Sequence, residues 1–318
     1  MGGYDKSICR LVVGLLVSLG ARAQRLVTQG PGRMNTVFLN GTYQPKEEAK
    51  ISPMDRGFLF GDSVYELIPS YEGSMVGFAL HIGRMNAGMA ATGIGLRWSE
   101  DDWRRLCEEL VSKNGGGNLG IYLQVSRGED TKRYHAFPDG VEPTVFGFVI
   151  AIPEPQVADK KLAKIGRVAT AQDYRWNRCD IKSTSLLGNV MLFQHGYGNG
   201  MSETLLFDTN DELTEASAAN AYIVSNGKVI TPPLSPHILA GVTRHILLSI
   251  LREDGSIAVE ERAVTREEVL QADEVWISTS TKEIVPVVEI DGKAVGDGEV
   301  GDVWLAAQAL YSSGKFDY

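Results

Sequence analysis

The chain has 318 residues, of which 43% are hydrophobic and 22% charged. This length and composition exclude a fibrous or disordered protein and allow two medium-sized domains. The formal net charge of -9 disfavours attraction to phosphate backbones or anionic lipid, so we expect no nucleic-acid partner. The three cysteines, Cys9, Cys107 and Cys179, contain no CxxC pair. They indicate neither a zinc site nor a disulfide framework and fit a reducing cytoplasm.

The N-terminal segment needs separate treatment. Residues 11–19 are apolar, follow basic residues and precede Ala21-Arg22-Ala23, a pattern that resembles a secretory signal peptide. The apolar run is too short to span a bilayer as a helix, and we expect no membrane association. Met34 directly precedes a strand pattern at which the folded protein can begin. We therefore interpret residues 1–33 as a leader or the product of a mis-assigned start codon, with a genuine targeting segment as the alternative, and expect a cytoplasmic protein.

The first predicted elements are a hairpin and a helix. Asn40-Gly41 follows the apolar run 37–39 and favours a tight turn between strands. A helix is predicted from Ser99, whose hydroxyl can cap Asp102, to the helix-ending Gly115. One apolar face of this helix is formed by Trp103, Leu106, Leu110 and Val111.

A linker is predicted near the middle of the chain. The apolar run 144–151 is typical of a strand, and Ile152-Pro153-Glu154-Pro155-Gln156 after it is typical of a connection between domains. We therefore predict a small domain over residues 34–152 and a larger one over residues 153–318.

The second half of the chain alternates helices with hairpins. Apolar periodicity and capping residues predict helices from Ser185 towards Gly196, from Gly241 to about Arg252, and from Thr265 through Leu270. Tight turns are predicted at Asn226-Gly227 and Asp291-Gly292. The chain is therefore α+β, without a fixed-period repeat.

Chemistry at the α-carbon of an amino acid needs an electron sink. Pyridoxal phosphate supplies one if the protein offers a lysine, a carboxylate for the pyridine nitrogen, a phosphate site and a clamp for the substrate carboxylate. Lys182 precedes an apolar helical pattern and is flanked by Arg175 and Arg178. Cationic neighbours and partial burial favour the neutral amine that attacks an aldehyde. Most lysines only keep a protein hydrated, so Lys182 alone does not identify a site.

The carboxylate and the phosphate site have candidates of their own. Glu215 precedes small residues that let a planar ring approach the backbone, although such a glutamate is more often a turn residue. The segment 239–244 offers Gly241, a hydroxyl and free amides at a helix start, which suits an anion but is usually only a cap. Ser280 and Thr281 can add hydroxyls to the same anion.

Four segments in this order resemble the fold-type IV aminotransferases, which include D-amino acid transaminase, branched-chain aminotransferase and aminodeoxychorismate lyase. The segments are residues 55–66, residues 178–183, Thr214-Glu215 with Asn220, and residues 241–244. The resemblance covers about residue 35 to the end and is closest to D-amino acid transaminase. It implies a small α/β domain, a larger domain with a barrel-like sheet, and pyridoxal 5'-phosphate between them.

The resemblance assigns roles residue by residue. It makes Lys182 the Schiff-base lysine and proton shuttle and Glu215 the partner of the pyridine nitrogen. Tyr65 is expected to line the substrate pocket, as is Thr281. The phosphate is expected to bind Arg84, Ser280, Gly241 and the amides of Val242 and Thr243.

The substrate carboxylate separates the subfamilies. Arg133 and His135 resemble the Arg-x-His trap of D-amino acid transaminases, which reaches the active site of the other subunit and implies a homodimer. A guanidinium suits a carboxylate because it binds both oxygens. The alternative, that both residues are only polar side chains of a surface loop, stays open. We therefore predict transamination between D-amino acids and 2-oxo acids, with 2-oxoglutarate as acceptor.

Alternatives remain open at this point. The L-branched-chain aminotransferase and aminodeoxychorismate lyase have the same cofactor, and a non-catalytic binding protein could keep the same fold. The sequence departs from the D-amino acid transaminase pattern by one extra residue between Gly128 and Arg133, by Gly83 before Arg84, and by alanines at 218 and 219. These departures bear on substrate range more than on the reaction.

Overall fold

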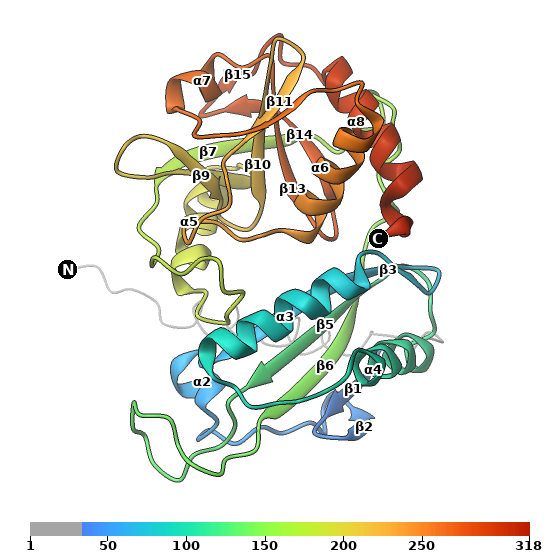
Figure 1. Ribbon diagram of the computed structural model, residues 1–318, viewed down its shortest axis with the longest axis vertical. Helices are drawn as coiled ribbons and strands as arrows, with labels where there is room; N and C mark the ends of the chain where they lie inside the picture. The colour runs from blue at the N-terminus through green and yellow to red at the C-terminus, as the bar shows by residue number, and fades with distance from the viewer. Residues whose placement is uncertain (1–33) are drawn as a thin grey trace, which may run out of the picture. The chain divides into compact units, whose positions relative to one another are not determined.

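The computed structural model describes residues 34–318, and the predicted leader lies outside them (Figure 1). Residues 35–318 contain two sheets, one built from residues 36–151 and one from residues 166–294. No helix among residues 34–318 has the length and apolarity needed to cross a membrane.

The first sheet is antiparallel, with strand order β2-β1-β6-β5-β3-β4. Its strands are β1 Thr36–Leu39, β2 Thr42–Pro45, β3 Ser63–Tyr71, β4 Ser74–Met75, β5 Leu119–Ser126 and β6 Thr144–Ala151. The short helix α2 (Arg56–Phe60) precedes β3, and α3 (Phe78–Thr92) and α4 (Glu100–Lys113) share one apolar core with the sheet. Ile121, Leu123 and Val125 alternate along β5 and point into that core, which leaves the opposite face of the sheet for the site.

The second sheet is mixed and curled, with strand order β12-β11-β10-β13-β14-β7-β8-β9 and β15 beside β14. Its strands are β7 Gly166–Gln172, β8 Glu203–Phe207, β9 Leu213–Ala216, β10 Asn220–Ser225, β11 Lys228–Thr231, β12 Val259–Glu261, β13 Glu274–Thr279, β14 Glu283–Ile290 and β15 Lys293–Ala294. Its helices are α5 Leu187–Gly198, α6 Val242–Asp254, α7 Arg266–Leu270 and α8 Asp302–Gly314, followed by the 3-10 turn η1 Lys315–Asp317. This is the predicted α+β fold with a half-barrel sheet.

The local predictions that rested on capping and turn chemistry are confirmed. Ser99 and Asp102 form a capping box at the start of α4, and Thr265 forms one with Glu268 at the start of α7. All three predicted turns join antiparallel strands with both turn residues at positive φ, as at Asn226 (51°) and Gly227 (73°). The helix predicted from Ser185 begins instead at Leu187.

The predicted linker is an anchored segment. Gln156 is buried, and its side-chain amide donates to the carbonyl oxygen of Ile284 at 2.7 Å. Its backbone N–H donates to the Glu283 carboxylate at 3.2 Å. The connection between β6 and β7 is therefore tied to β14, and a domain boundary at residue 152 stays a prediction.

Candidate active site

A cavity of about 510 Å³ is lined by side chains from both sheets. A volume of this size is typical of pockets for cofactors and small ligands. The lining includes every predicted site residue except Arg133 and His135, namely Tyr65, Arg84, Lys182, Glu215, Gly241, Val242, Thr243, Ser280 and Thr281. Segments up to 217 residues apart in the chain, from Tyr65 to Lys282, thus meet around one space.

Lys182 is placed in the cavity by backbone hydrogen bonds to the first sheet. The N–H of Tyr65 donates to the Lys182 carbonyl oxygen at 3.0 Å, and the N–H of Thr184 donates to the carbonyl oxygen of Ser63 at 3.0 Å. The Lys182 Nζ lies 4.2 Å from the centre of the Tyr65 ring. The half-buried amine therefore lies over an aromatic face that lines the same cavity.

The two arginines that flank Lys182 in the sequence form ion pairs with acidic side chains. Arg178 is paired with Asp180 near the surface, with Nε 3.0 Å from Oδ1. Arg175 is buried and pairs with Asp173 and Glu215. Both guanidiniums therefore have carboxylate partners, and their influence on the Lys182 amine stays a prediction.

Glu215 is a buried acid whose oxygens both accept hydrogen bonds. Oε1 accepts from Arg175 Nη1 at 2.7 Å, and Oε2 accepts from Asn220 Nδ2 at 3.1 Å and from the Leu239 N–H at 3.0 Å. Burial raises the pKa of Glu215 to about 7, and Arg175 opposes that shift by stabilising the carboxylate. A cationic ring nitrogen arriving in the cavity would favour the carboxylate further.

Arg175 connects Glu215 to a second acid. Its Nε and Nη2 donate to the two oxygens of Asp173 at 3.0 and 2.8 Å. Burial disfavours the charge of Arg175, but the bonds to Asp173 and the nearness of Glu215 raise its pKa above the ordinary value. Asp173 was not predicted, because a single aspartate after a strand carries no signal of its spatial partners.

Glu66 was also missed, and it orients the predicted phosphate residue Arg84. Burial opposes the charge of Glu66, yet Arg84 and His81 hold the pKa of its carboxyl well below the usual range. Arg84 donates Nε and Nη2 to Glu66 at 2.7 Å each, and Nη1 to the Ala240 carbonyl oxygen at 2.9 Å. A guanidinium has five N–H donors, so two remain for an anion in the cavity.

The residues at the start of α6 suit a phosphate group. Gly241 precedes the helix, and no side chain caps its first amides, which include those of Val242 and Thr243. Ser280 and Thr281 add hydroxyls and Arg84 adds a cation to the same cavity lining. The donors facing the cavity here match an anion, while Glu215 matches a protonated ring nitrogen and Lys182 an aldehyde. The residues present therefore fit pyridoxal phosphate.

Gly241 also fixes how closely α6 approaches Glu215. A Cβ at this position would lie 2.0 Å from Asn220 Oδ1. Asn220 is buried and cannot move aside without losing its bonds to Glu215 and to the Leu239 carbonyl oxygen. We expect Gly241→Ala to weaken pyridoxal-phosphate binding about tenfold, equivalent to ~1.4 kcal/mol, in absorbance titrations of the cofactor-free protein. The control is Gly83→Ala, where a Cβ meets no atom within 4 Å. Equal affinity of the two variants would contradict the role of Gly241.

The raised pKa of Glu215 predicts a pH-dependent stability of the cofactor-free protein. Its ordinary value is 4.5, so the folded state holds an extra proton between pH 4.5 and 7, and stability falls as pH rises through this window. The difference between a pKa of 4.5 and one of about 7 corresponds to roughly 3 kcal/mol. The measurement is the free energy of urea unfolding of wild type and of Glu215→Gln across this pH range. We expect the difference between the two proteins to fall as pH rises, and to fall less once the cofactor is bound. A difference that does not change with pH would contradict the raised pKa of Glu215.

A further acid in the cavity was not predicted. Glu203, the first residue of β8, is buried, and its carboxylate accepts from the Thr204 N–H at 2.8 Å and from the hydroxyl of Ser217. Burial raises its pKa. Lys282 lines the same cavity, and its charge opposes this rise. A glutamate heading an apolar strand is the sequence signal that could have drawn attention to it, because an acid in a buried strand needs a partner.

Arg133 and His135 lie away from this cavity within one chain. Both are exposed and lie against Phe60, the last residue of α2. The Arg133 guanidinium carbon is 5.1 Å from the ring centre, and the His135 ring centre is 5.5 Å from it. Their role as a carboxylate clamp therefore stays a prediction that needs a second subunit.

The fold and the cavity define an enzyme that brings together a lysine, a buried acid and an anion site. Residues 63–290 match the family described as amino-transferase class IV. The D-alanine aminotransferase of Bacillus licheniformis is 37% identical over 278 residues, covering 87% of this chain and 96% of the relative. That of Staphylococcus haemolyticus is 36% identical over 271 residues, covering 85% and 94%. The chain therefore belongs to the class IV aminotransferases.

Solved structures support the fold. The branched-chain amino acid aminotransferase from Escherichia coli superposes with a TM-score of 0.78 at 24% identity, covering 89% of this chain and 95% of that one. The branched-chain aminotransferase from Thermobaculum terrenum, described in its PLP form, gives 0.79 at 21% identity and covers 90% and 95%. At such identities the likeness shows a common fold. Class IV aminotransferases depend on pyridoxal phosphate.

Proposed function

We propose that this enzyme transfers the amino group of D-amino acids, of the D-alanine type, to a 2-oxo acid such as 2-oxoglutarate, with pyridoxal 5'-phosphate held by Lys182. The observation that carries the proposal is one cavity containing Lys182, the buried Glu215 and the anion site before α6. The relatives named D-alanine aminotransferase support the choice of substrate, since they align over nearly their whole length.

The cofactor, when bound, supplies an electron sink for the substrate α-carbon. Lys182 Nζ would hold the cofactor through its aldehyde carbon and, once free, would carry the proton from the substrate α-carbon. Glu215, oriented by Arg175 and Asn220, keeps the ring nitrogen protonated. Arg84, fixed by Glu66, and the first amides of α6 bind the phosphate. Tyr65 and Thr281, which also line the cavity, would contact the substrate.

We further propose that Arg133 and His135 hold the substrate carboxylate in a neighbouring subunit. Their exposure and their distance from the cavity lining of their own chain support action across a dimer. The surface of α5 supports such a dimer, because Leu187 and Met191, which lie outside the cavity lining, are 73% and 66% exposed. A helix that begins with so many exposed apolar side chains is typical of an interface. A cytoplasmic location is proposed from the free cysteines Cys107 and Cys179.

The experiment compares amino transfer to 2-oxoglutarate from D-alanine and from L-leucine, using protein confirmed to carry cofactor. Turnover of D-alanine is expected. Turnover of L-leucine alone would favour an L-branched-chain aminotransferase and would mean that Arg133 and His135 are not the clamp. Pyruvate release from aminodeoxychorismate without amino transfer would favour the lyase. A protein that binds no pyridoxal phosphate would support the non-catalytic alternative.

A further inference from the structure

The loop that carries Arg133 and His135 connects β5 to β6 and closes tightly at its base. Gly128 has a φ of +105°, and a Cβ there would lie 2.0 Å from the Glu142 carbonyl oxygen. The backbone therefore needs glycine at this crossing. Beyond it, the side chains of residues 131–137 are exposed, so the loop has no apolar core that would fix its shape.

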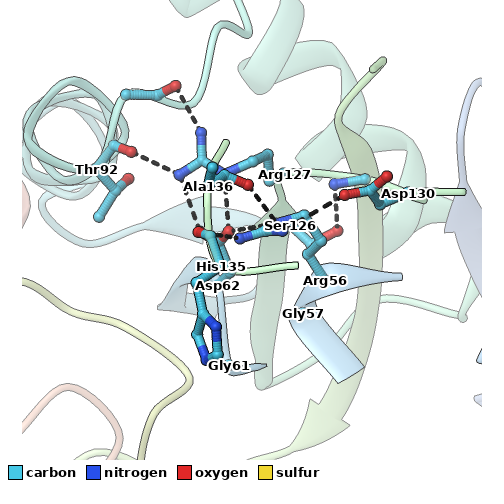
Figure 2. A network of polar contacts seen from close by, with 12 residues as sticks. Arg56, Gly57, Gly61, Asp62, Thr92, Ser126, Arg127, Asp130, His135 and Ala136 are labelled. Carbon is cyan, nitrogen blue, oxygen red and sulfur yellow. Dashed lines mark hydrogen bonds and ion pairs between the residues drawn. The ribbon is translucent and has the colours of Figure 1, made fainter. Parts of the chain in front are cut away.

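One buried guanidinium binds the backbone of this loop. Arg56 Nη1 donates to the carbonyl oxygens of Tyr134 at 2.6 Å and Ala136 at 3.3 Å, and Nη2 donates to that of His135 at 3.3 Å (Figure 2). Three successive carbonyls thus converge on a side chain that is 3% exposed. Because every one of these bonds is to the main chain, the side chains of Arg133 and His135 stay free for a ligand.

Arg56 is itself held on its other edge. Its Nε donates to Asp62 Oδ2 at 2.9 Å, and Arg127 donates Nε to the same oxygen at 2.7 Å (Figure 2). Burial opposes the charge of Asp62, but hydrogen bonds from Arg127 and Arg56 keep the pKa of its carboxyl below the ordinary value. The backbone N–H of Arg56 also donates to the Gly128 carbonyl oxygen at 2.9 Å. The guanidinium plane therefore has one orientation relative to α2 and β3.

We propose that Arg56 is a positioning residue for substrate recognition, which fixes the loop conformation that presents Arg133 and His135 to a carboxylate. The inference rests on the proposed function, in which those two side chains hold the substrate. Phe60 completes the arrangement, because Arg133 and His135 both lie against its ring and Phe60 belongs to the same short helix as Arg56. A lysine cannot replace Arg56, since an ammonium lacks the planar fork that spans three carbonyls and a carboxylate.

The test measures the first half-reaction of the cofactor-loaded enzyme, followed by cofactor absorbance, with D-alanine and with ethylamine. Ethylamine is D-alanine without the carboxylate. In Arg56→Lys we expect the apparent Kd for D-alanine to rise about 10- to 100-fold, the range for losing charged hydrogen bonds. The limiting rate and the reaction with ethylamine should change by less than about twofold, because the variant leaves the cavity lining intact.

Arg127→Lys is the matched control. Arg127 is as buried as Arg56 and binds the same Asp62, but it donates to the carbonyls of Thr92 and Gly93 at the end of α3. Its contact with the loop is the Phe137 ring, beyond residues 134–136. A comparable loss of thermal stability with little change in the Kd for D-alanine is expected. Equal rises in Kd in both lysine variants would overturn the specific role of Arg56.

A double-variant cycle separates positioning from general damage. If Arg56 acts through Arg133, then Arg56→Lys has little further effect on the Kd for D-alanine in an Arg133→Ala background. Full additivity, or an equal loss with ethylamine, would overturn the proposal. If Arg56→Lys does not fold, Phe60→Leu removes the ring under Arg133 and His135 while keeping Arg56, and the same selective effect is expected. Wild type that reacts with L-leucine but not D-alanine would instead contradict the proposed function, and the inference with it.

Discussion

Replacing Lys182 with alanine is expected to lower kcat for amino transfer from D-alanine by about 10³-fold or more. In the proposed function the amine both attaches the cofactor and moves the α-proton, and positioned proton transfer alone contributes roughly 10²- to 10⁴-fold. Added methylamine should restore part of the rate, because it can supply the missing base. The measurement is steady-state turnover of cofactor-loaded protein.

The matched control for that loss is Lys161→Ala. Lys161 is exposed in the segment between β6 and β7 and lies outside the cavity lining. Turnover of this variant should equal that of wild type. If Lys182→Ala keeps activity within about threefold of wild type, Lys182 is not the reacting amine, because a lost general base cannot cost so little.

Glu215→Gln is expected to lower kcat about 100-fold while pyridoxal phosphate remains bound. The amide removes the negative charge that, in the proposed function, pairs with the ring nitrogen, and a buried charged hydrogen bond of about 3 kcal/mol corresponds to this factor. The phosphate residues are unchanged, and Arg175 keeps its bonds to Asp173. Turnover is measured at saturating cofactor, with occupancy read from absorbance.

Glu215→Asp keeps the charge one methylene further from the cavity and should fall between wild type and Glu215→Gln. Such an order would separate the effect of charge from that of distance. Equal activity of Glu215→Gln and wild type would remove Glu215 from its assigned role, whatever the effect on thermal stability.

The predictable part of the fold depends on local chemistry. Turn pairs such as Asn226-Gly227 need positive φ at two positions, and capping pairs such as Ser99 with Asp102 satisfy free amides at a helix start. Both are decided within a few residues. Helices α3 and α8 were not predicted: α3 contains Gly83 and Gly88, which weaken a helical pattern, and α8 opens with no side-chain cap.

Site residues could be predicted where a short sequence motif contains them. Lys182, Glu215 and Gly241 were predicted in this way; the structure brings them to one cavity, and their roles there stay predictions. Their orienting partners were not, because Asp173 and Glu66 become meaningful only when the fold brings them to Arg175 and Arg84. Arg56 lay within a recognised segment, yet its hydrogen bonds to residues 78 to 80 positions away cannot be inferred from sequence spacing.

The central claim, that Lys182 carries pyridoxal phosphate in this cavity, is tested most directly by sodium borohydride reduction of the purified protein, proteolysis and mass spectrometry. The account predicts a phosphopyridoxyl group on the peptide containing Lys182, absent in Lys182→Ala. Modification of a different lysine, or of none in protein loaded with the cofactor, would contradict it.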